Sequence, residues 1–533
     1  MARKSGGAGH VDVAVVGGGV SGLYSAWRLK QAHPKKTIVV YESDYRTGGR
    51  LLTAIPPKAD HLRAELGGMR FLSTHRIVAG LATLLKLDVE PFPVSEATNV
   101  AYLRGFHFQR QNLDQDLPLP YRLAANERNT SIGNLMGAAL DAIVPGITTL
   151  APEKRLAKTY ASSFHGRPLN EWGFWNALYR VMSAEAYQFV VDASGYDTTM
   201  SNWNAADAIP WFLADFGATV TYKFPRQGMQ SIPDGIRDLF EGLGGHVLLH
   251  TTVKRIARNG ATIRLEIDGK PDVEADDVVL AMPRRALELI DLKDLFAKDA
   301  PRVTSLIESV SPQPLFKLFA CYGRPWWTEK LGLTQGQSTT DVPIRQTYYF
   351  GTEGLQPGGD KKNTNSLLMA TYDDGRNIKY WIGFLRENKP KPYPSGGGSV
   401  EWQRNPAPQT LVDEVHRLLA EVHGVALDSI PKPYAAAYRD WGLDPFGGGY
   451  NLWKIHTDSI AVARDIVSPV KGLRAYICGE AYSHDQGWTE GAVETAEDML
   501  QRYFGLKEPA WLRGTPQAPS GSASTGTSAT LRY

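Results

Sequence analysis

The chain has 533 residues, a formal net charge of +2, and a composition that is 43% apolar and 21% charged. This length corresponds to roughly three to four domain-sized units of ordinary globular composition, with room for a large core. Basic residues are dispersed among acidic ones, so the basic stripe typical of nucleic-acid binding is missing and no nucleic-acid partner is expected. The sequence contains no run of about 18 apolar residues, so a membrane span is not expected.

The first predicted elements form a nucleotide-binding unit. A Val-rich strand over residues 11–16 leads into three glycines, and a helix is predicted over residues 21–30. Gly17 permits the tight turn out of the strand, Gly19 lets the backbone approach a pyrophosphate, and Gly22 lets the helix pack close to the sheet. This arrangement of strand, glycine turn and helix predicts a bound dinucleotide.

The residues around this turn are also suited to a dinucleotide. Ser21, which follows Val20, begins the predicted helix, whose N–H groups and dipole would point at the phosphates. Glu42, which is followed by Ser43, comes directly after the next predicted strand, at residues 37–41. At this position a carboxylate can accept hydrogen bonds from both ribose hydroxyls. Because that carboxylate disfavours a 2′-phosphate, NADP is not expected.

Later segments return to the same domain. The short strands rich in Val and Leu are typical of a nucleotide-binding sheet, and each group is accompanied by an amphipathic helix. The nucleotide-binding domain is therefore predicted to be discontinuous, with pieces at residues 8–70, 226–310 and 470–506. Helices are expected over residues 231–243 and 489–504, and strands over residues 244–250, 253–256, 277–283 and 474–480.

Two other regions are inserted between these pieces. Residues 126–225 have helix-like patterning with many aromatics and predict a helical subdomain. Residues 71–125 and 311–469 alternate more and predict a mixed-sheet domain that covers a substrate pocket. The fold class expected is thus α/β, Rossmann-like, with two insertions. Strands are expected at residues 348–350, 367–370 and 380–384, turns at the glycine runs 396–398 and 447–449, and disordered tails at residues 1–7 and 514–533.

The cysteines and the N-terminus bear on the cellular compartment. Cys321 and Cys478 lie in apolar strand-like runs, which predicts buried, reduced thiols. The basic N-terminal residues are not followed by the apolar segment of a signal peptide. A cytoplasmic location is expected, with secretion left open.

A second motif, Arg46-Thr47-Gly48-Gly49-Arg50, follows the glycine turn. A dinucleotide fingerprint followed by Arg-x-Gly-Gly-Arg resembles the flavin-containing amine oxidase superfamily. The resemblance covers residues 11–505 and implies FAD as the cofactor, a glutathione-reductase-type FAD-binding domain, and a homodimer. In that family the last arginine of the motif, here Arg50, lies against the flavin and the phosphates.

The motif Gly67-Gly68-Met69-Arg70 narrows the resemblance to the L-amino acid oxidase branch, in which this arginine holds the substrate carboxylate. A guanidinium suits that task because it forms a planar, charge-assisted fork with a carboxylate. Residues 184–187 and 194–197 are more similar to the bacterial amino acid oxidase and monooxygenase group than to the venom enzymes.

The resemblance also assigns residues in the second half of the chain. It implies that Lys317 reaches the flavin N5 through a water, that the Val253 backbone contacts the adenine, and that Glu480 binds the ribityl chain. Trp488 would wall the substrate amine and, with Lys317 and Arg70, make up the catalytic set. The flavin site so implied comprises Gly17, Gly19, Val20, Ser21, Gly22, Glu42, Ser43, Gly49, Arg50, Gly67, Gly68, Met69, Arg70, Val253, Glu480, Gly487, Trp488 and Thr489.

The substrate pocket is less completely assigned. Beside Arg70, Gly487 and Trp488, the resemblance implies Tyr372 as a carboxylate contact, although Thr371 fits the spacing equally, and Tyr450 as a pocket wall. The histidine base proposed for venom enzymes has no convincing counterpart. We expect a roomy apolar pocket from Trp203, Trp211, Trp441 and Tyr450, and we interpret Asp207, Asp215 and Asp444 as surface caps or turn residues rather than as selectors of a basic side chain.

The resemblance implies an FAD-dependent L-amino acid oxidase with an L-amino acid and O2 as substrates. Hydride transfer from Cα to flavin N5 would leave an imine, whose hydrolysis gives a 2-oxo acid and ammonia, with hydrogen peroxide from O2. An amino acid 2-monooxygenase, which forms an amide, is the alternative. A polyamine or monoamine oxidase conflicts with Arg70, and a flavin-binding module without catalysis conflicts with the retention of Arg70, Lys317 and Trp488 together.

Overall fold

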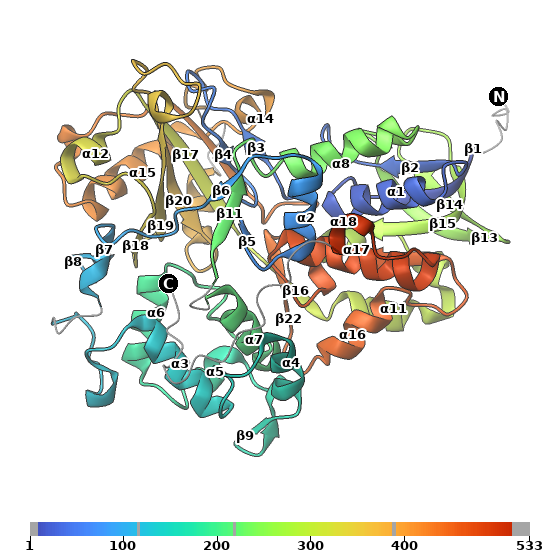
Figure 1. Ribbon diagram of the computed structural model, residues 1–533, viewed down its shortest axis with the longest axis horizontal. Helices are drawn as coiled ribbons and strands as arrows, with labels where there is room; N and C mark the ends of the chain where they lie inside the picture. Colours follow the sequence, from blue (N-terminus) through green and yellow to red (C-terminus); the bar gives the residue numbers. More distant parts are fainter. Residues whose placement is uncertain (1–8, 114–117, 217–219, 386–390, 514–533) are drawn as a thin grey trace.

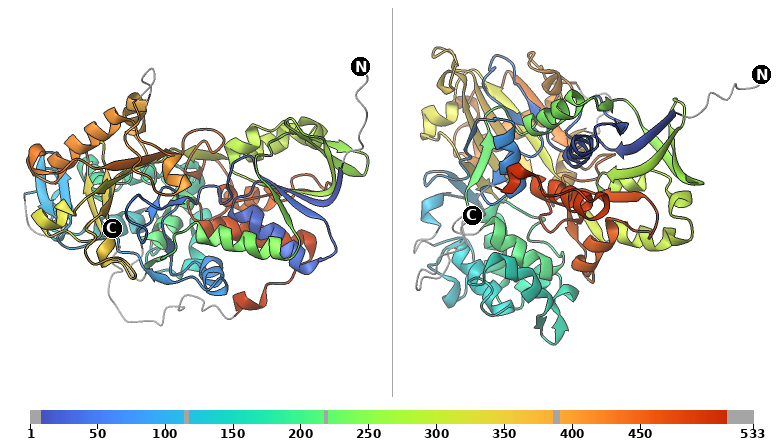
Figure 2. Two further views of the ribbon diagram at one scale, coloured as in Figure 1. Left: turned by 90° about the horizontal axis from the view of Figure 1, so that it is seen from above. Right: turned by 45° about the vertical axis from the view of Figure 1, so that its right-hand side comes forward.

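The computed structural model describes residues 9–113, 118–216, 220–385 and 391–513. The chain forms a nucleotide-binding region, a second region built on a large sheet, and a group of helices that lies against both (Figure 1). Seen from above, the two large sheets occupy opposite ends of the molecule (Figure 2). The predicted disordered tails, residues 1–7 and 514–533, fall outside the described residues.

The nucleotide-binding sheet has seven strands, in the order β12-β2-β1-β15-β14-β13 with β23 also on β15. Strands β12, β2, β1, β15 and β23 pair in parallel, whereas β14 is antiparallel to both β15 and β13. All three predicted pieces of the nucleotide-binding domain therefore contribute strands to one sheet, and we propose the predicted boundaries for this domain. The strands are β1 (Gly9–Val16), β2 (Ile38–Tyr41), β12 (His246–Leu248), β13 (Val253–Asn259), β14 (Thr262–Ile267), β15 (Val273–Ala281) and β23 (Ala475–Cys478).

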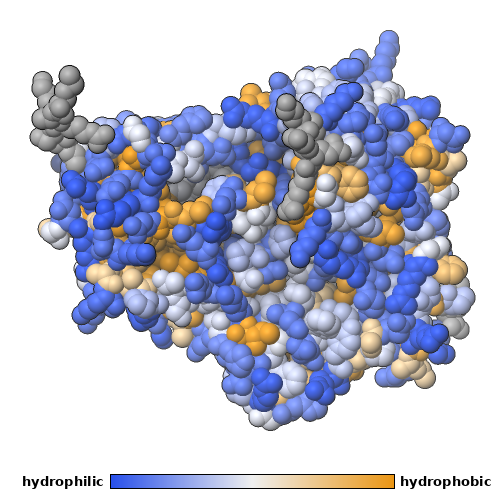
Figure 3. Space-filling model, turned by 180° about the vertical axis from the view of Figure 1, so that it is seen from behind, coloured by the Kyte–Doolittle hydropathy of each residue, from blue (hydrophilic) through white to orange (hydrophobic). Residues whose placement is uncertain are grey.

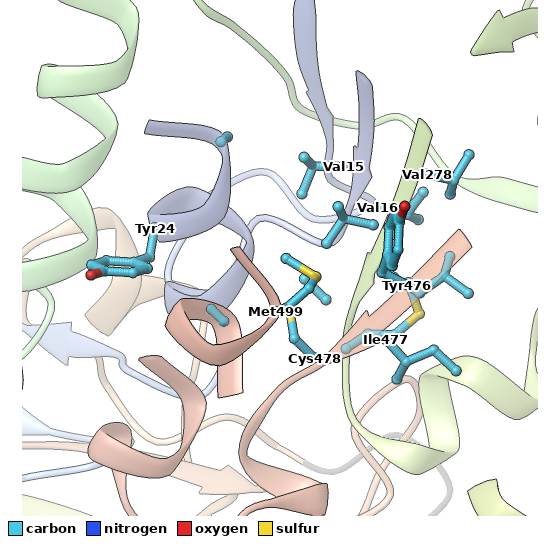
Figure 4. Packing of buried hydrophobic residues seen from close by; sticks show 14 of the residues in the cluster. Val15, Val16, Tyr24, Val278, Tyr476, Ile477, Cys478 and Met499 are labelled. Atoms are coloured by element: carbon cyan, nitrogen blue, oxygen red, sulfur yellow. The ribbon is translucent and has the colours of Figure 1, made fainter. Parts of the chain in front are cut away.

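Three helices bury the parallel strands: α1 (Val20–Ala32) packs against α8 (Ser231–Gly242), α17 (Thr489–Phe504) and the strands β1, β2 and β15. The parallel strands read as continuous apolar runs because both of their faces are covered. Figure 4 shows Val15 and Met499 on one face of the parallel strands and Val278 and Ile477 on the other, all within this core. Smaller helices surround it: α2 (Arg76–Leu84), α9 (Arg284–Glu288), α10 (Lys293–Phe296), α11 (Ala300–Ile307), α16 (Ser459–Ile466) and α18 (Ala510–Arg513).

A buried ionic contact joins the first and last of the long helices. The Arg28 guanidinium on α1 pairs with the Glu497 carboxylate on α17, and both side chains are about 5% exposed. Tyr24 donates to the same carboxylate at 2.8 Å. Because removal of one member of such a pair strands a buried charge at a cost of about 3–5 kcal/mol, this contact helps to fix the helices that begin at the nucleotide site.

The second sheet has the strand order β21-β17-β20-β19-β18-β7-β8, antiparallel except for the parallel pair β18 and β7. Residues of β17 alternate between its faces. Phe316 and Leu318 pack toward helix α15, whereas Phe319 and Cys321 belong to the core on the opposite face. The same alternation directs Lys317 toward that opposite face. Strands are β7 (Val100–Leu103), β8 (Phe106–Gln109), β17 (Phe316–Tyr322), β18 (Gln337–Thr340), β19 (Gln346–Thr352), β20 (Ser366–Asp373) and β21 (Ala435–Asp440), and helices are α12 (Trp326–Leu331), α13 (Ile378–Leu385), α14 (Val400–Gln403) and α15 (Gln409–Val422).

The strand predicted at residues 380–384 is wrong, because these residues belong to helix α13. A short apolar run of this kind does not distinguish a strand from a helix by its pattern alone. In the structure Trp381 stacks on Phe316 with ring centres 5.7 Å apart, while Tyr380 on the neighbouring helix face is partly exposed. Packing against the sheet therefore decided the conformation.

The region at residues 126–225 contains five α-helices in its described part, and we propose it as the predicted helical subdomain. Its helix α7 carries Trp211 and Asp215 to the wall of a cavity described below. The N-cap residue Asn204 accepts a hydrogen bond from the Ala206 N–H at 3.0 Å, which satisfies one of the free donors of the first turn. The elements are α3 (Ile132–Ile143), α4 (Pro152–Tyr160), α5 (Phe174–Leu178), α6 (Ala184–Ser194) and α7 (Ala205–Asp215), with a small hairpin of β9 (Ser163–Phe164) and β10 (Arg167–Pro168).

Three small sheets connect the regions and position side chains at the centre. They bring together segments that are distant in sequence, such as Tyr222 and Leu72. They are β3 (Thr53–Ala54) with β4 (Ala64–Glu65), β11 (Tyr222–Pro225) between β5 (Phe71–Leu72) and β6 (Val89–Pro91), and β16 (Val310–Gln313) with β22 (Tyr450–Trp453).

Both cysteines are free and buried, as predicted. On the face shown in Figure 3, hydrophilic residues predominate and hydrophobic residues form small groups between them. In the described ranges, none of the helices combines the length and apolar character needed to cross a bilayer. The cytoplasmic location stays a prediction.

Candidate active site

A cavity of about 790 Å³ opens where the parallel strands β1, β2 and β15 end and helices α1 and α17 begin. Ligands of open α/β sheets bind at this carboxyl edge. Most residues predicted for the flavin site line it: Gly17, Gly19, Val20, Ser21, Glu42, Ser43, Gly49, Arg50, Gly68, Val253, Glu480, Gly487, Trp488 and Thr489.

The three predicted glycines have different surroundings. Gly17 has φ +105°, and a Cβ there would lie 2.5 Å from the Ala281 carbonyl oxygen. Gly22 does not line the cavity; a Cβ there would lie 2.0 Å from the Gly17 oxygen, so the bare backbone lets α1 approach the turn. A Cβ at Gly19 would meet no atom within 4 Å, because this position faces open space in the cavity. The turn is therefore a cradle for a group that approaches the backbone closely.

The Arg-x-Gly-Gly-Arg turn lies directly against this cradle. The Gly48 N–H donates to the Gly18 oxygen at 2.9 Å. Arg46 braces the turn by donating to the carbonyl oxygens of Thr47 at 2.9 Å and Leu51 at 2.8 Å. The two glycine motifs thus form one continuous wall of the cavity.

Glu42 closes the other end of the cradle. Its Oε2 accepts the Gly18 N–H at 2.6 Å and its Oε1 accepts the Asp44 N–H at 2.8 Å. Burial raises the pKa of the Glu42 carboxyl, and these two N–H donors oppose the shift. Val253 lines the same cavity. Glu42 thus offers a carboxylate to the cavity, and its predicted contact with the ribose stays a proposal.

Arg50 and Glu480 form an ion pair at the inner end of the cavity, with Nη2 and Oε2 2.8 Å apart. The other Glu480 oxygen accepts the backbone N–H groups of Asn451 at 2.9 Å and Gly487 at 2.8 Å. The Asn451 amide donates to Oε2 at 3.0 Å, so protein donors fill about four acceptor positions of the carboxylate. The ribityl contact predicted for Glu480 would replace one of these donors, and it stays a proposal.

A smaller cavity of about 130 Å³ adjoins this inner end and shares Arg50, Gly68 and the segment 487–489 with the larger one. It brings together the residues predicted for catalysis and substrate binding with several that were not predicted. Predicted residues on its wall are Gly67, Met69, Arg70, Lys317, Tyr372, Tyr450, Trp211 and Trp441, and it is completed by Tyr196, Thr199, Asp215 and Leu315.

Arg70 is held in this small cavity by aromatic residues. Its guanidinium donates to the hydroxyl groups of Tyr348 at 3.2 Å and Tyr196 at 3.0 Å, and lies 4.4 Å from the ring centre of Tyr222. Among the described residues no carboxylate lies within 4 Å of it. A fixed, buried guanidinium without an ion-pair partner is suited to bind an incoming anion.

Lys317 also lines the small cavity and is almost fully buried. Its ammonium donates to the carbonyl oxygens of Glu65 at 3.1 Å and Gly67 at 2.5 Å. Burial and the nearby Arg70 lower the pKa of Lys317 to about 7, against the opposing effect of the Glu65 carboxylate. Burial also raises the pKa of Glu65 to about 7. Each of the two groups therefore titrates near neutral pH.

The structure separates the two candidates for a carboxylate contact. Tyr372 lines the small cavity, whereas Thr371 does not and donates to the Ile344 oxygen at 2.9 Å. The Tyr450 hydroxyl donates to the buried Asp374 carboxylate at 3.1 Å. Trp203, expected in the pocket, lies instead in the core of the helical region.

The interpretation of the acidic residues as surface groups is wrong at two positions. Asp207 is 5% exposed and accepts hydrogen bonds from Tyr160 and Ser459, while Asp215 is 7% exposed and lines the small cavity. Asp444 lies near the surface and pairs with Arg285 at 2.7 Å. Helix α7 buries the first two because it packs into the centre of the molecule, which a local sequence pattern does not show.

Trp488 separates the small cavity from a buried histidine. Its ring makes an edge contact with His75, with centres 5.0 Å apart, and lies 6.4 Å from the Tyr222 ring. Burial lowers the pKa of His75 to about 3, so the imidazole is neutral. His75 does not line either cavity and therefore does not replace the missing histidine base.

The two cavities are suited to a dinucleotide and a small anionic substrate. The larger one offers the open backbone at Gly19, the N-termini of α1 and α17, and the Glu42 carboxylate, which together fit a pyrophosphate with a ribose. The smaller one offers the Arg70 guanidinium next to the shared wall. Tyr196 and Tyr348, which hold Arg70, were missed as site residues; the similarity noted at residues 194–197 was the one signal for the first.

Comparisons with known proteins identify relatives along most of the chain. A family model described as flavin containing amine oxidoreductase matches residues 20–389. Aplysianin-A from Aplysia kurodai is 27% identical over 525 residues, covering 93% of this chain and 90% of that protein. An L-amino-acid oxidase from Siganus canaliculatus is 25% identical over 504 residues, covering 91% of this chain and 83% of that protein.

Solved structures share the fold. A double mutant of putrescine oxidase superposes with a TM-score of 0.64 at 19% identity, covering 93% of this chain and 100% of that one. Wild-type putrescine oxidase bound to putrescine gives a TM-score of 0.63 at 17% identity, covering 92% and 99% of the two chains. The predicted α/β fold class is confirmed.

The close approach at Gly22 predicts that Gly22→Ala abolishes flavin retention. The added Cβ would force α1 away from the Gly17 turn and distort the cradle. The flavin absorbance per mole of purified protein should fall at least about tenfold, since a loss of more than about 1.4 kcal/mol in binding is expected from overpacking.

Gly137→Ala is the matched control. Gly137 lies inside helix α3 and a Cβ there would meet no atom within 4 Å, so this variant should keep full flavin content and unfold at the same or a slightly higher temperature. Full flavin content in the Gly22→Ala variant would contradict the role given to this glycine.

Proposed function

The chain belongs to the flavin containing amine oxidoreductase family, with FAD as its cofactor, and we propose that it is an L-amino acid oxidase. The observation that carries the proposal is the buried Arg70 guanidinium, fixed by two tyrosine hydroxyls on the wall of the small cavity that adjoins the cofactor cavity. An amino acid has a carboxylate for this cation, whereas a polyamine or a monoamine does not. The similarity to L-amino-acid oxidases over 91% of the chain supports the same reading.

In this proposal Arg70 fixes the substrate carboxylate and thereby the direction of the Cα–H bond. Orientation of this kind accounts for a large part of enzymatic rate acceleration. FAD, when bound, supplies the two-electron acceptor for the oxidation of the amine. Gly487 and Trp488, on the wall shared by both cavities, would border the substrate amine, and Tyr372 and Tyr450 would line the remainder of the pocket.

Lys317 is proposed to assist the reaction with O2. Its ammonium is held by two backbone carbonyls in a site without bulk water, where a positive charge stabilises the negative charge that O2 acquires on reduction. The Glu65 carboxyl, whose pKa is about 7, acts on Lys317 through its charge and titrates in the same pH range. The homodimer expected from the resemblance stays a prediction.

Product analysis tests the proposed reaction. The purified flavoprotein should turn over L-amino acids, but not D-amino acids or putrescine, with hydrogen peroxide and 2-oxo acid formed in equal amounts. Amide without matching peroxide would instead identify an amino acid 2-monooxygenase. Turnover of putrescine alone would overturn the proposal.

Arg70→Ala should raise KM and lower kcat together, reducing kcat/KM for an L-amino acid by about 10²- to 10⁴-fold, since two charge-assisted hydrogen bonds are lost. The corresponding L-amino acid amide, which lacks the carboxylate, should lose much less. Arg70→Lys should rescue poorly because a point charge does not replace the fork.

Arg76→Ala provides the control for this variant. Arg76 pairs with Glu508 and does not line either cavity, so its kcat/KM values should change by less than about threefold. Equal losses for the amino acid and the amide in Arg70→Ala would remove Arg70 from the carboxylate site.

Lys317→Met should slow the reaction of the reduced enzyme with O2 by about 10- to 100-fold, corresponding to about 1–3 kcal/mol of lost charge stabilisation, while anaerobic reduction by substrate is nearly unchanged. The pKa of Lys317 is lowered to about 7, so its ammonium prevails below that pH. The O2 rate constant of the wild type should therefore fall as pH rises through about 7, measured by stopped-flow absorbance. A pH step that persists in the Met variant would assign the titration to Glu65, and an unchanged O2 rate constant would refute the role of Lys317.

A further inference from the structure

Asp215 is a buried carboxylate on the wall of the small cavity. It is the last residue of helix α7, one turn after Trp211, and both residues line the cavity because positions i and i+4 share a helix face. Its 7% exposure means that the carboxylate has little contact with bulk water. A charge removed from water in this way needs a partner.

The protein provides only some of the hydrogen bonds that the Asp215 carboxylate can accept. The single Tyr222 hydroxyl proton is shared between the Asp215 backbone carbonyl oxygen at 2.9 Å and Oδ1 at 3.2 Å. Within the described ranges no donor reaches Oδ2, and no cationic side chain lies within 4 Å of the carboxylate. Burial raises the pKa of Asp215 to about 6, opposed by the charge of Arg70 and the Tyr222 hydrogen bond. At neutral pH the carboxylate is therefore mostly ionised, and its Oδ2 accepts no hydrogen bond from the described residues.

The cationic side chains on the cavity wall are committed elsewhere. Arg50 pairs with Glu480 at 2.8 Å. Arg70 donates to the hydroxyls of Tyr196 and Tyr348, and the Lys317 ammonium donates to backbone carbonyls. Tyr222 lies between Arg70 and Asp215, because its ring face contacts the guanidinium and its hydroxyl contacts the carboxylate. The cavity thus has an anion site and a cation site at different positions.

We propose that Asp215 binds the side-chain cation of the substrate, so that the preferred substrates are L-amino acids with a basic side chain. This inference rests on the proposed function. Once a substrate carboxylate neutralises Arg70, the charge of Asp215 lacks a counter-charge, which a distal ammonium or guanidinium supplies. A neutral side chain leaves the carboxylate unpaired, and an acidic one adds a like charge next to it.

The aromatic walls suit the same ligand. Trp211 and Trp441 line the cavity, and indole rings pack against methylene groups and attract a cation over their faces. The apolar pocket expected from these aromatic residues therefore also contains the Asp215 carboxylate. Such a pocket would hold the stem of a long basic side chain with its head at Asp215.

Two other roles for Asp215 make different predictions. As acceptor of the α-ammonium proton it would be needed for every substrate, and as a partner of Tyr222 alone it would affect stability without affecting selectivity. The comparison of L-lysine with L-norleucine separates these roles, since the two substrates have the same number of side-chain carbons and differ in the terminal cation.

The test is kcat/KM for L-lysine, L-norleucine and L-glutamate in the wild type and in Asp215→Asn. The wild type should prefer L-lysine over L-norleucine by about 10²-fold, the order expected for a buried charge pair, and should oxidise L-glutamate least. In Asp215→Asn this ratio should fall to within about threefold of unity, through a higher KM for L-lysine and with L-norleucine retained.

Asp207→Asn is the matched control, because Asp207 is a buried acid of the same helix that lines neither cavity. It should leave the L-lysine to L-norleucine ratio unchanged. Where the Asn variant at position 215 does not retain flavin, Asp215→Glu replaces it: the carboxylate extends one methylene further into the cavity, so preference should shift from L-lysine toward the shorter L-ornithine.

Several results would overturn the inference. These are a wild type that oxidises L-norleucine as well as L-lysine, an Asp215→Asn variant that loses activity on both equally, or an Asp215→Glu variant with unchanged chain-length preference. Failure of the proposed function has a different signature, since no L-amino acid would then be oxidised at all.

Discussion

The ion pair between Arg50 and Glu480 is the contact on which both cavities depend. Its carboxylate binds Arg50 from the glycine turn, Asn451 from strand β22, and Gly487 from the segment that precedes α17. These segments come from three distant parts of the chain and meet where the larger cavity joins the smaller one. Since all four acceptor positions of the carboxylate are used, loss of this single group would release the wall that the cofactor and the substrate share.

Three charged side chains on the wall of the small cavity are buried, and each has a different kind of hydrogen-bond partner. Arg70 uses tyrosine hydroxyls and ring faces, Lys317 uses backbone carbonyls, and Asp215 has one phenol. None of these partners carries an opposite charge. In our proposals Arg70 and Asp215 therefore keep their capacity to bind charged groups of the substrate, and Lys317 keeps its charge for the reaction with O2. In a poorly hydrated site such interactions are stronger than in water, which favours discrimination by charge.

Much of the cofactor cavity could be predicted because its residues act within short segments. The turn at Gly17, the helix after it and the acid Glu42 lie within one strand–helix–strand unit, whose geometry follows from local sequence. The surroundings of Arg70 could not be predicted in this way, because Tyr196 and Tyr348 are separated from it by 126 and 278 positions. For the same reason the burial of Asp215 was missed: helix α7 shows its own period but not the surface against which it packs. The helix at residues 378–385 was missed because packing on Phe316, and not its own pattern, selects its conformation.

The division of the site between elements separates cofactor chemistry from substrate choice. The glycine turn, the pair of Arg50 and Glu480, and the N-terminus of α17 belong to the nucleotide-binding region and its immediate contacts, and their features are independent of what is oxidised. Arg70, Tyr222 and Asp215 lie on or next to β5, β11 and α7, at the junction with the inserted regions. A shared fold with putrescine oxidase at 17–19% identity is therefore compatible with a different substrate, because the charges that we propose to recognise it come from these junction elements.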